Sequence, residues 1–562
     1  MSDHGRPTPR RRQRPEEKEE EDNISSSSGK SVAAKGTPWW SEKRIWAAAL
    51  AFRAANALLI QTYFNPDEHW QSLEVAHRVV FGYGHLTWEW KKGIRSYLHP
   101  LVFALLYKVL GFLRSDTPWF MAKAPRLLQS LFASIGDVYM YKLSKLIFDE
   151  HVAKWALFCQ LMNWFMFFCI TRTLSNSLET VLTVVGLFYW LASSGSSKQL
   201  SVASRKLGLF IAALACAVRP TSAITWLYVG VLYLIRTQSR LHFLYFEVVP
   251  MGILVLAMSC LLDWWMYGSF TIVPLNFLRF NFFSSGGDYY GTHPWHWYFT
   301  QGFPSMLLTF LPYAVIGILK SKEWRISGLI AWVLGIYSVL SHKEFRFVLP
   351  VLPIALIFSG YSLSLMSKPD LLDMKKRKSQ PGNKCPSRVQ LAVLFLVATN
   401  VPMALYMSSI HQLGLGSKLI LHDSYKSVLP SQRGSEDVMI YLSKEAHKGK
   451  VRSLLFLMPC HSTPYYSTLH HDLPMRFLDC TPSDTKGILD ESDRFLIDPL
   501  GFVMSMFTNS SLPSHIVLFS SEEKQLRELL ISYSFDEIKR FFHAHFKVDR
   551  DLQASVVVYA LT

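Results

Sequence analysis

The sequence is poor in charged residues and in cysteine. Only 18% of its 562 residues are charged, and it holds seven cysteines. A soluble chain of this length carries about 25% charged residues and divides into several domains. Seven cysteines are too sparse for a secreted scaffold held by disulfides. Because half of the residues are apolar, the composition predicts a membrane protein that crosses the bilayer several times and carries a soluble part.

The sequence also lacks the common nucleotide and cofactor motifs. It has no Walker loop, no GxSxG or HExxH sequence and no dinucleotide-binding fingerprint. A soluble nucleotide-sugar or ATP site is therefore unsupported. His293 and His296 are close in sequence, but no cysteine or carboxylate set completes a metal site around them. We expect neither a metal ion nor a cofactor.

The formal net charge of +16, from 58 Lys and Arg against 42 Asp and Glu, fits two explanations. One is nucleic-acid binding, and the other is a set of basic loops on the cytoplasmic side of a membrane. The positions favour the second, so no nucleic-acid partner is expected. Arginines near the N-terminus contribute, in a polar segment over 1–40 that we predict to be a disordered cytoplasmic tail. The other basic clusters lie in short connections at 198–206, 236–240, 320–325 and 368–384.

Apolar runs of spanning length predict an all-α polytopic domain over 41–408, with about 11 or 12 transmembrane helices. Arg219-Pro220 interrupts one long run, and since proline removes a helical hydrogen bond, two shorter helices are expected there. Simple alternation across the membrane fails within 97–170, which indicates a re-entrant or wrongly divided segment. The runs lie near 45–64, 97–113, 124–148, 152–170, 177–193, 207–235, 243–262, 304–319, 325–341, 346–366 and 388–408.

Residues 409–562 are predicted to form a soluble lumenal domain of mixed α/β type. Asn509 begins an N-glycosylation sequon, which suits a lumenal position. Cys460 and Cys480 are either a disulfide in an oxidising lumen or two buried thiols. Strand-like runs lie at 451–458, 515–519 and 554–560, and a helical run lies at 521–531.

The segment Asn65-Pro66-Asp67-Glu68-His69-Trp70-Gln71, after the first apolar run, has the residues of a helix start. Asparagine suits the N-cap, proline the first turn, and acids complement the helix dipole. Asp67 and Glu68 have two explanations. They either only stabilise the helix start, or one of them is a carboxylate held at the membrane surface as a general base.

A second cluster, Ser341-His342-Lys343-Glu344-Phe345-Arg346-Phe347, lies between two apolar runs, where ionisable groups are costly. Lys343 and Arg346 could grip a phosphate with His342 donating to it, or they could snorkel to the interface. The aromatic loop His293-Pro294-Trp295-His296-Trp297-Tyr298 either anchors the protein at the interface or walls a lipid or sugar. Arg172 and Arg219 sit at edges of apolar runs, where a structural partner for the charge is expected.

Two of these segments resemble a known family. The segment 65–71 resembles the first-lumenal-loop motif of the dolichyl-phosphate-mannose-dependent α-mannosyltransferases, and 342–347 resembles their second motif. Phe345 stands where an acid is common, so that acid is not expected to be essential. A narrower resemblance, to the branch that adds the third mannose of the glycosylphosphatidylinositol (GPI) anchor, is carried by the stretches 82–90, 291–298 and 458–467. The likeness runs from about residue 45 to the end.

The resemblance implies a GT-C fold in the endoplasmic reticulum membrane, with a lumenal active site. It implies dolichyl-phosphate-mannose as donor, a dimannosyl GPI lipid as acceptor and an inverting transfer that forms an α-1,2 linkage. Asp67 would be the base, with Glu68 as the other candidate. The donor phosphate would be bound by His342, Lys343 and Arg346. The substrate-binding residues would be His69, Gln71, His293, Trp295, His296 and Arg219.

Three alternatives stay open on the sequence. A related enzyme with the same donor could act on the N-glycan precursor or add the fourth GPI mannose. A protein of another class, a transporter or lipid scramblase, would also place charges inside the membrane. Neither the protein partners nor the acceptor follow from the residues alone.

Overall fold

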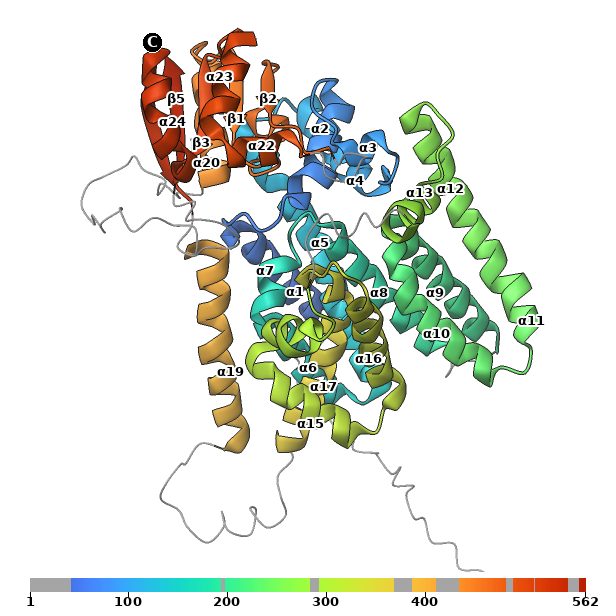
Figure 1. The fold of residues 1–562 in the computed structure, drawn as a ribbon. Coiled ribbons are helices and arrows are strands. Elements are labelled where there is room, and N and C mark those ends of the chain that lie inside the picture. The colour runs from blue at the N-terminus through green and yellow to red at the C-terminus, as the bar shows by residue number, and fades with distance from the viewer. Residues whose placement is uncertain are drawn as a thin grey trace, which may run out of the picture.

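The computed structural model describes residues 42–193, 198–283, 293–367, 387–410, 434–481, 489–509, 511–543 and 555–562. A large helical bundle is followed by a smaller region that holds a sheet, and this C-terminal region lies at one end of the bundle (Figure 1). The predicted fold class, a polytopic helical protein with a mixed α/β C-terminal region, is confirmed.

Several of the long helices of the bundle are rich in apolar residues. Within the described residues, five helical stretches are long and apolar enough to cross a membrane: Ser201–Val218, Arg240–Tyr267, Tyr298–Ser321, Phe345–Ser367 and Arg388–Ile410. The remaining bundle helices are α1 (Glu42–Leu59), α5 (Pro118–Ile147), α6 (Glu150–Met162), α7 (Trp164–Cys169), α8 (Ser175–Ala192), α10 (Ala223–Arg236) and α16 (Trp324–Val339).

The break at Arg219-Pro220 is confirmed. Helix α9 (Lys198–Val218) ends just before Arg219, a 3₁₀ turn, η3, covers Pro220–Ser222, and α10 begins at Ala223. The long run 243–262 lies in α11 (Arg240–Phe243), η4 (Leu244–Val248) and α12 (Val249–Tyr267), followed by α13 (Val273–Leu278). The run 304–319 forms α14 (Phe303–Leu307) and α15 (Leu311–Ser321), and the run 388–408 forms α19 (Arg388–Leu405) with η10 (Tyr406–Ile410).

The connection after α1 holds several short helices. They are η2 (His69–Leu73), α2 (Glu74–Phe81), α3 (Trp88–Lys91) and α4 (Leu98–Phe112). Helix α4 packs Phe103 and Tyr107 against Leu73 and Ala76 of this same connection. Figure 1 shows α4 beside α2 and α3, next to the C-terminal region.

This packing corrects the division of 97–170. With α4 left out of the spans, α5 is the second crossing and α6 with α7 the third. Alternation then places the basic connections 236–240 and 320–325 on the face opposite α4 and the C-terminal region. The basic residues 198–206 lie on that face too, at the start of α9 and not in a connection, whereas 368–384 lies outside the described residues. The run 97–113, predicted as a span, is thus part of the first connection. Its exposed side chains, such as Leu105 and Phe112, suit a helix that lies along a membrane surface.

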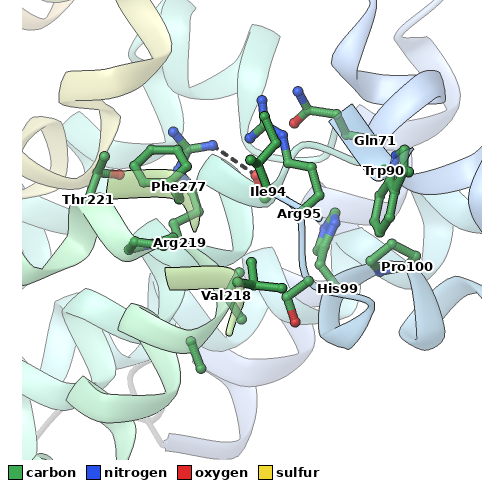
Figure 2. Close-up of a pocket in the computed structure, with 15 residues that line it drawn as sticks. Gln71, Trp90, Ile94, Arg95, His99, Pro100, Val218, Arg219, Thr221 and Phe277 are labelled. Atoms are coloured by element: carbon green, nitrogen blue, oxygen red, sulfur yellow. Dashed lines mark hydrogen bonds between the residues drawn. The ribbon is translucent and has the colours of Figure 1, made fainter. Parts of the chain in front are cut away.

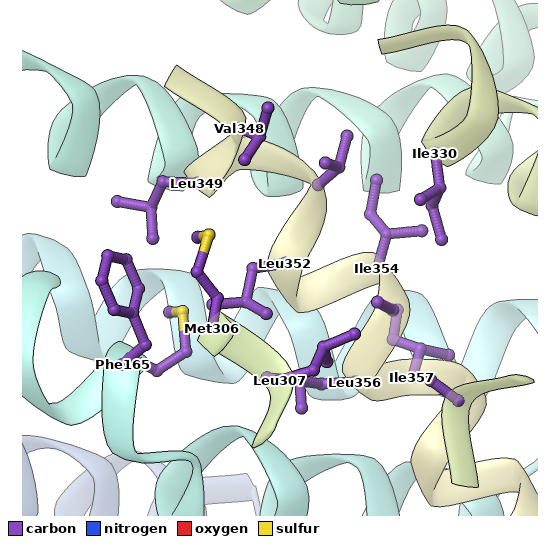
Figure 3. Close-up of a cluster of buried hydrophobic side chains, with 14 of the residues drawn as sticks. Phe165, Met306, Leu307, Ile330, Val348, Leu349, Leu352, Ile354, Leu356 and Ile357 are labelled. Atoms are coloured by element: carbon purple, nitrogen blue, oxygen red, sulfur yellow. The ribbon is translucent and has the colours of Figure 1, made fainter. Parts of the chain in front are cut away.

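The centre of the bundle is the helix made by η9 (Phe345–Val351) and α17 (Leu352–Ser367). Its most apolar window is 89% buried inside the protein, against 17–39% for the other four spans. Leu352, Ile354 and Ile357 of this helix meet side chains from α7, α14 and α16, as Figure 3 shows. Gly317 of α15 meets the carbonyl oxygen of Phe358 so closely that a Cβ would not fit, which is the close backbone approach that small residues permit between membrane helices.

The C-terminal region is a five-stranded mixed sheet with strand order β2-β1-β3-β5-β4. Strand β1 pairs in parallel with β2 and β3, whereas β5 pairs antiparallel with β3 and β4. The strands are β1 (Leu454–Leu457), β2 (Met475–Phe477), β3 (His515–Phe519), β4 (Phe535–Phe542) and β5 (Ser555–Leu561). The helices are α20 (Gly434–His447), α21 (Tyr466–Leu469), α22 (Glu491–Ile497), α23 (Pro499–Asn509) and α24 (Ser520–Ser532).

The three strands and the helix predicted in this region are confirmed as β1, β3, β5 and α24. Strands β2 and β4 were not predicted, because β2 has three residues and the middle of β4 is charged and exposed. Cys460 and Cys480 form a disulfide. Asn509 is the last residue of α23, and its side chain and Ser510 lie outside the described residues, so glycosylation there stays a prediction.

Candidate active site

The predicted helix start at Asn65 is present. The Asn65 side-chain oxygen accepts a hydrogen bond from the Asp67 amide at 3.0 Å, and the Asn65 carbonyl accepts one from the Glu68 amide at 3.1 Å. The next turn, η2, is a π-helical turn before α2 begins. Such turns are rare and occur frequently at functional sites. The local sequence therefore places two neighbouring carboxylates at the N-terminus of a helical segment.

The Asp67 carboxylate lies in a partly open cluster of charges. It accepts a hydrogen bond from Arg346, and 20% of its side chain stays exposed. The Arg346 guanidinium in turn donates to both oxygens of Glu344, at 2.5 and 2.7 Å. His342 lies 3.0 Å from the same carboxylate. The segments 65–71 and 342–347 thus meet in one site, although Asp67 and Arg346 are 279 positions apart in the chain. We call this site the open cluster: Asp67, His342, Glu344 and Arg346.

Glu344 is ionised in this cluster. Burial opposes its charge, but the Arg346 guanidinium and the His342 ring outweigh burial, so the pKa of Glu344 lies well below its ordinary value. The Tyr298 hydroxyl donates to the Glu344 carbonyl at 2.8 Å and accepts from the Glu344 amide at 3.1 Å. Tyr298, from the aromatic loop, therefore fixes the backbone that presents the Arg346 partner.

Glu68 lies in entirely different surroundings. Only 1% of its side chain is exposed, and it faces Arg172 at 2.8 Å and Arg126 at 3.5 Å. Arg126 also pairs at 2.6 Å with Glu436, at the start of α20. We call these four residues the closed chain: Glu436, Arg126, Glu68 and Arg172. Arg172 further donates to the Thr62 and Phe168 carbonyls, each at 2.7 Å. The structural partner expected for Arg172 is therefore Glu68.

Lys343, the remaining charged residue of the second motif, does not contact the open cluster through its ammonium but bonds to backbone carbonyls. Lys343 is buried, and its ammonium donates to the carbonyls of His293 at 2.9 Å and Leu340 at 2.5 Å. Burial lowers the pKa of Lys343. Its phosphate-binding role stays a prediction, since the structure gives this ammonium to backbone oxygens.

The aromatic loop divides into outward and inward side chains. Trp295 is 70% exposed, and His296 is exposed as well. His293 is exposed but stacks on the buried Trp297 at 4.8 Å between ring centroids. Trp297 in turn contacts Phe345 of the second motif at 4.9 Å. The loop therefore packs against the open cluster, while the predicted substrate contacts of His293, Trp295 and His296 stay predictions.

Gln71 and Arg219 line one cavity, which Figure 2 shows. The cavity has a volume of about 40 Å³ and lies between the first connection and the break at Pro220. Arg219 and Phe277 border it on one side, and Gln71 and His99 lie on the other, with Arg95 between them. Arg219 pairs with Glu179 at 3.1 Å and donates to the Ser175 hydroxyl at 3.0 Å. Arg95 was not predicted, because it looks like an ordinary loop charge.

The C-terminal region holds the other side of η2. His69 stacks on Tyr63 at 5.7 Å and lies 3.8 Å from Glu436, so it is part of a protein contact. The Trp70 indole donates to the Thr463 carbonyl at 3.0 Å. Glu74 accepts from the Tyr465 amide at 2.8 Å and the Ser467 hydroxyl at 2.6 Å, and its burial raises its pKa. The C-terminal region thus holds the helical turns that directly follow both candidate bases.

Sequence reasoning did not find Arg126, Glu436 or His461 as site residues. The carbonyl of His461 accepts a hydrogen bond from the Tyr63 hydroxyl at 2.7 Å, and its ring lies 4.6 Å from that of Trp70. The available signal for Arg126 is a charge inside an apolar run, which costs free energy without a partner. Glu436 and His461 had no local signal, since only the fold brings α20 and 458–467 to the first connection. Within the residues that the structure describes, no group of three or more His, Cys, Asp or Glu side chains is placed to hold a metal ion, and the metal-free reaction stays a prediction.

Comparison with known proteins adds the family. The sequence profile of the Alg9-like mannosyltransferase family matches residues 44–470. The chain is 61% identical to a protein named Mannosyltransferase APTG1 from Arabidopsis thaliana, over 93% of this chain and 92% of that protein. It is 39% identical to GPI alpha-1,2-mannosyltransferase 3 from Homo sapiens, over 91% and 85% of the two chains. It is 37% identical to GPI mannosyltransferase 3 from Yarrowia lipolytica, over 91% and 96%.

Among solved structures, the crystal structure of ArnT from Cupriavidus metallidurans bound to undecaprenyl phosphate matches with a TM-score of 0.56. The match covers 92% of this chain and 97% of ArnT at 13% sequence identity. The apo form of ArnT matches with a TM-score of 0.57. The predicted GT-C fold is therefore confirmed.

Proposed function

The chain belongs to the Alg9-like mannosyltransferase family and is an α-1,2-mannosyltransferase of the GPI type, and from this premise we propose its substrates and mechanism. The donor is dolichyl-phosphate-mannose, and the acceptor is the 2-hydroxyl of the second mannose of a GPI precursor. The observation that carries the mechanism is the difference between two neighbouring carboxylates. Asp67 is partly exposed with one arginine beside it, whereas Glu68 is enclosed between two arginines.

The transfer is a single inverting displacement. Asp67 accepts the proton of the acceptor 2-hydroxyl while that oxygen forms a bond to C1 of the donor mannose. The bond between C1 and the phosphate oxygen breaks, and dolichyl phosphate leaves with the electron pair. General base catalysis of this kind supplies about 10²–10⁴-fold in rate. Arg346, held by Glu344 at 2.5 and 2.7 Å, fixes the Asp67 carboxylate in place.

The leaving phosphate needs positive charge more than a proton. Arginines at two places border the first connection: Arg346, beside the ring of His342, in the open cluster, and Arg95 with Arg219 in the cavity of Figure 2. Gln71, which also lines that cavity, lies one helical turn after Asp67. ArnT, which shares the fold, is described with undecaprenyl phosphate bound. That ligand is a polyprenyl phosphate, and dolichyl phosphate has the same chemistry.

The site is assigned to the lumenal face of the endoplasmic reticulum membrane. The basic connections 236–240 and 320–325, and the basic start of α9, lie on the opposite face, as expected of cytoplasmic residues. The Cys460–Cys480 disulfide lies on the same face as the open cluster, and disulfides persist in oxidising compartments such as this lumen. Both observations support the assignment.

Lipid profiling tests the reaction step. In cells that lack this protein, we expect a GPI intermediate with two mannoses to accumulate, and re-expression should clear it. Accumulation of a three-mannose intermediate would instead assign the fourth mannose. Normal GPI lipids together with truncated N-glycans would overturn the proposal. Microsomes from the re-expressing cells, given dolichyl-phosphate-mannose and the dimannosyl lipid, should form the three-mannose product, which a transporter or scramblase would not do.

A further inference from the structure

A second cavity lies between the first connection and the C-terminal region. Its volume is about 210 Å³. One wall comes from residues 85–91, around the start of α3, and the other from His461 and from β2 with the residues that follow it, to Thr481. Pockets that enclose whole drug-sized ligands measure roughly 300–1,000 Å³, so this cavity suits one part of a larger molecule.

The cavity has aromatic walls. The rings of His85 and Phe477 lie 4.7 Å apart, and those of His461 and Phe477 lie 5.7 Å apart. Trp88 also lines it. Such rings offer flat apolar faces on which the C–H face of a sugar can lie. His461 has a left-handed backbone, with φ of 64°, which costs free energy in a residue other than glycine and is found at binding sites.

Polar groups point to a ligand with hydroxyls. Thr87 is 4% exposed, and within the described residues its buried Oγ1 has no hydrogen-bond partner. A buried hydroxyl without a partner is costly unless a ligand or water completes it. Asp479 also lines the cavity, and its Oδ1 accepts from the amide and the hydroxyl of Thr481 at 2.9 and 2.6 Å. Lys91 and Arg476 complete the polar lining.

The wall of this cavity contacts the turn that follows the candidate base. The Trp70 ring, from η2, contacts His461 at 4.6 Å and Phe477 at 5.3 Å. Burial lowers the pKa of His461 to about 4, against the opposing effect of the Asp67 carboxylate, so the ring is neutral and lies within electrostatic reach of that carboxylate. Gln71, the next residue after Trp70, lines the other cavity. The turn η2, which follows Asp67, therefore lines one cavity through Gln71 and contacts the wall of the other through Trp70.

Enzymes that share a donor and differ in acceptor must differ where the acceptor binds. The stretches 82–90 and 458–467, which carry the narrower resemblance, contribute residues to the two walls of this cavity. The stretch 65–71, which resembles the motif of the whole family, only contacts the outside of its wall, through Trp70. We propose that this cavity binds one pyranose ring of the acceptor glycan, with hydroxyls paired to Thr87 and Asp479. The inference rests on the proposed function, whose acceptor it places.

Two conservative variants test the subsite. Thr87→Val removes the hydroxyl and keeps the shape, and Asp479→Asn removes the charge and keeps the shape. In the full-length protein, each should raise the KM for the dimannosyl GPI lipid about 3- to 10-fold, the value of one hydrogen bond. The KM for dolichyl-phosphate-mannose should not change. The same lipid should bind 3- to 10-fold more weakly to an Asp67→Asn protein that also carries Thr87→Val.

The chain offers matched controls. Thr117→Val makes the same change at an exposed helix start whose side chain, like that of Thr87, makes no capping bond. Asp472→Asn makes the same change at an exposed position near the cavity wall. Both controls should leave the acceptor KM unchanged. Thermal unfolding of each variant shows whether the fold is kept.

Each outcome decides the proposal. If folded Thr87→Val and Asp479→Asn proteins keep the acceptor KM, or raise only the donor KM, the cavity is not an acceptor subsite. If the wild type forms no product but binds the dimannosyl lipid in a Thr87-dependent way, the proposed function fails and the subsite stands. If it neither transfers mannose nor binds that lipid, both fail.

Discussion

The open cluster and the closed chain each consist of two carboxylates and two basic side chains, but one is partly exposed and the other is buried. In the open cluster, Asp67 keeps 20% of its side chain exposed and pairs with Arg346. In the closed chain, Glu68 keeps 1% exposed and is enclosed by Arg172 and Arg126. A carboxylate that must accept a proton from a substrate has to be reached by it. One buried between two cations instead holds elements together. The dipeptide Asp67-Glu68 thus combines a chemical role with a structural one.

The largest expected effect is on Asp67. Asp67→Asn keeps the shape and a hydrogen-bond acceptor for Arg346 but cannot take a proton. Transfer of mannose to the dimannosyl lipid should fall about 10²–10⁴-fold, with thermal unfolding unchanged. The control is Asp116→Asn, because Asp116 is also partly exposed, at 32%, and its carboxylate lies 3.3 Å from the ring of His470. Retained transfer in a folded Asp67→Asn protein would assign the base to Glu68 and reverse the comparison.

The next effect is on stability. Glu68→Gln leaves Arg172 and Arg126 without their shared carboxylate, and breaking a buried ion pair costs about 3–5 kcal/mol. We expect a large drop in thermal stability and in the yield of folded protein, with transfer per folded molecule largely kept. Replacing Arg172 as well, with methionine, should recover part of the loss, since the uncompensated charge is removed. A stable Glu68→Gln protein without transfer would make Glu68 the catalytic carboxylate.

The two sides of the comparison differ in how far the sequence predicts them. The open cluster follows from two local motifs, because residues 65–71 and 342–347 each carry an unusual density of charge. The closed chain does not, since Glu436 reads as an ordinary helix residue and reaches Arg126 only through the fold. Helix α4 also could not be placed from its own sequence. Its composition is that of a transmembrane span, but it packs against Leu73 and Ala76 of the first connection. Hydrophobic pattern fixes which segments are helices, whereas long-range packing decides what each one covers.

A smaller effect comes from pH, through the contact of the C-terminal region with α2. Burial lowers the pKa of His77 to about 3, with the neighbouring His470 ring, 3.1 Å away, adding to the effect. Between pH 6.5, where an unfolded histidine takes up its proton, and pH 3, the unfolded chain binds a proton that the folded one does not. Stability should therefore fall as the pH is lowered, by about 1.4 kcal/mol per pH unit for this group.

Thermal unfolding of wild type and His77→Gln between about pH 7 and about pH 5 measures this slope. The variant cannot take up the proton and should show a shallower loss than the wild type. His296→Gln is the control, because His296 is exposed. An equal slope in the wild type and His77→Gln would show that the contact does not depend on a neutral His77.

The smallest expected effect comes from replacing Lys343. This residue is next to Glu344 of the open cluster in sequence, yet its ammonium is buried and bonded to backbone carbonyls. Its ammonium donates to the His293 carbonyl at 2.9 Å and so ties the aromatic loop to the second motif. Lys343→Met should cost about 1 kcal/mol of stability, the value of a hydrogen bond, and leave the KM for dolichyl-phosphate-mannose unchanged. Lys320→Met, at an exposed position in α15, is the control for removing a lysine. A donor KM raised tenfold or more would mean that this ammonium turns from the carbonyls to the phosphate. Lys343 would then belong to the open cluster.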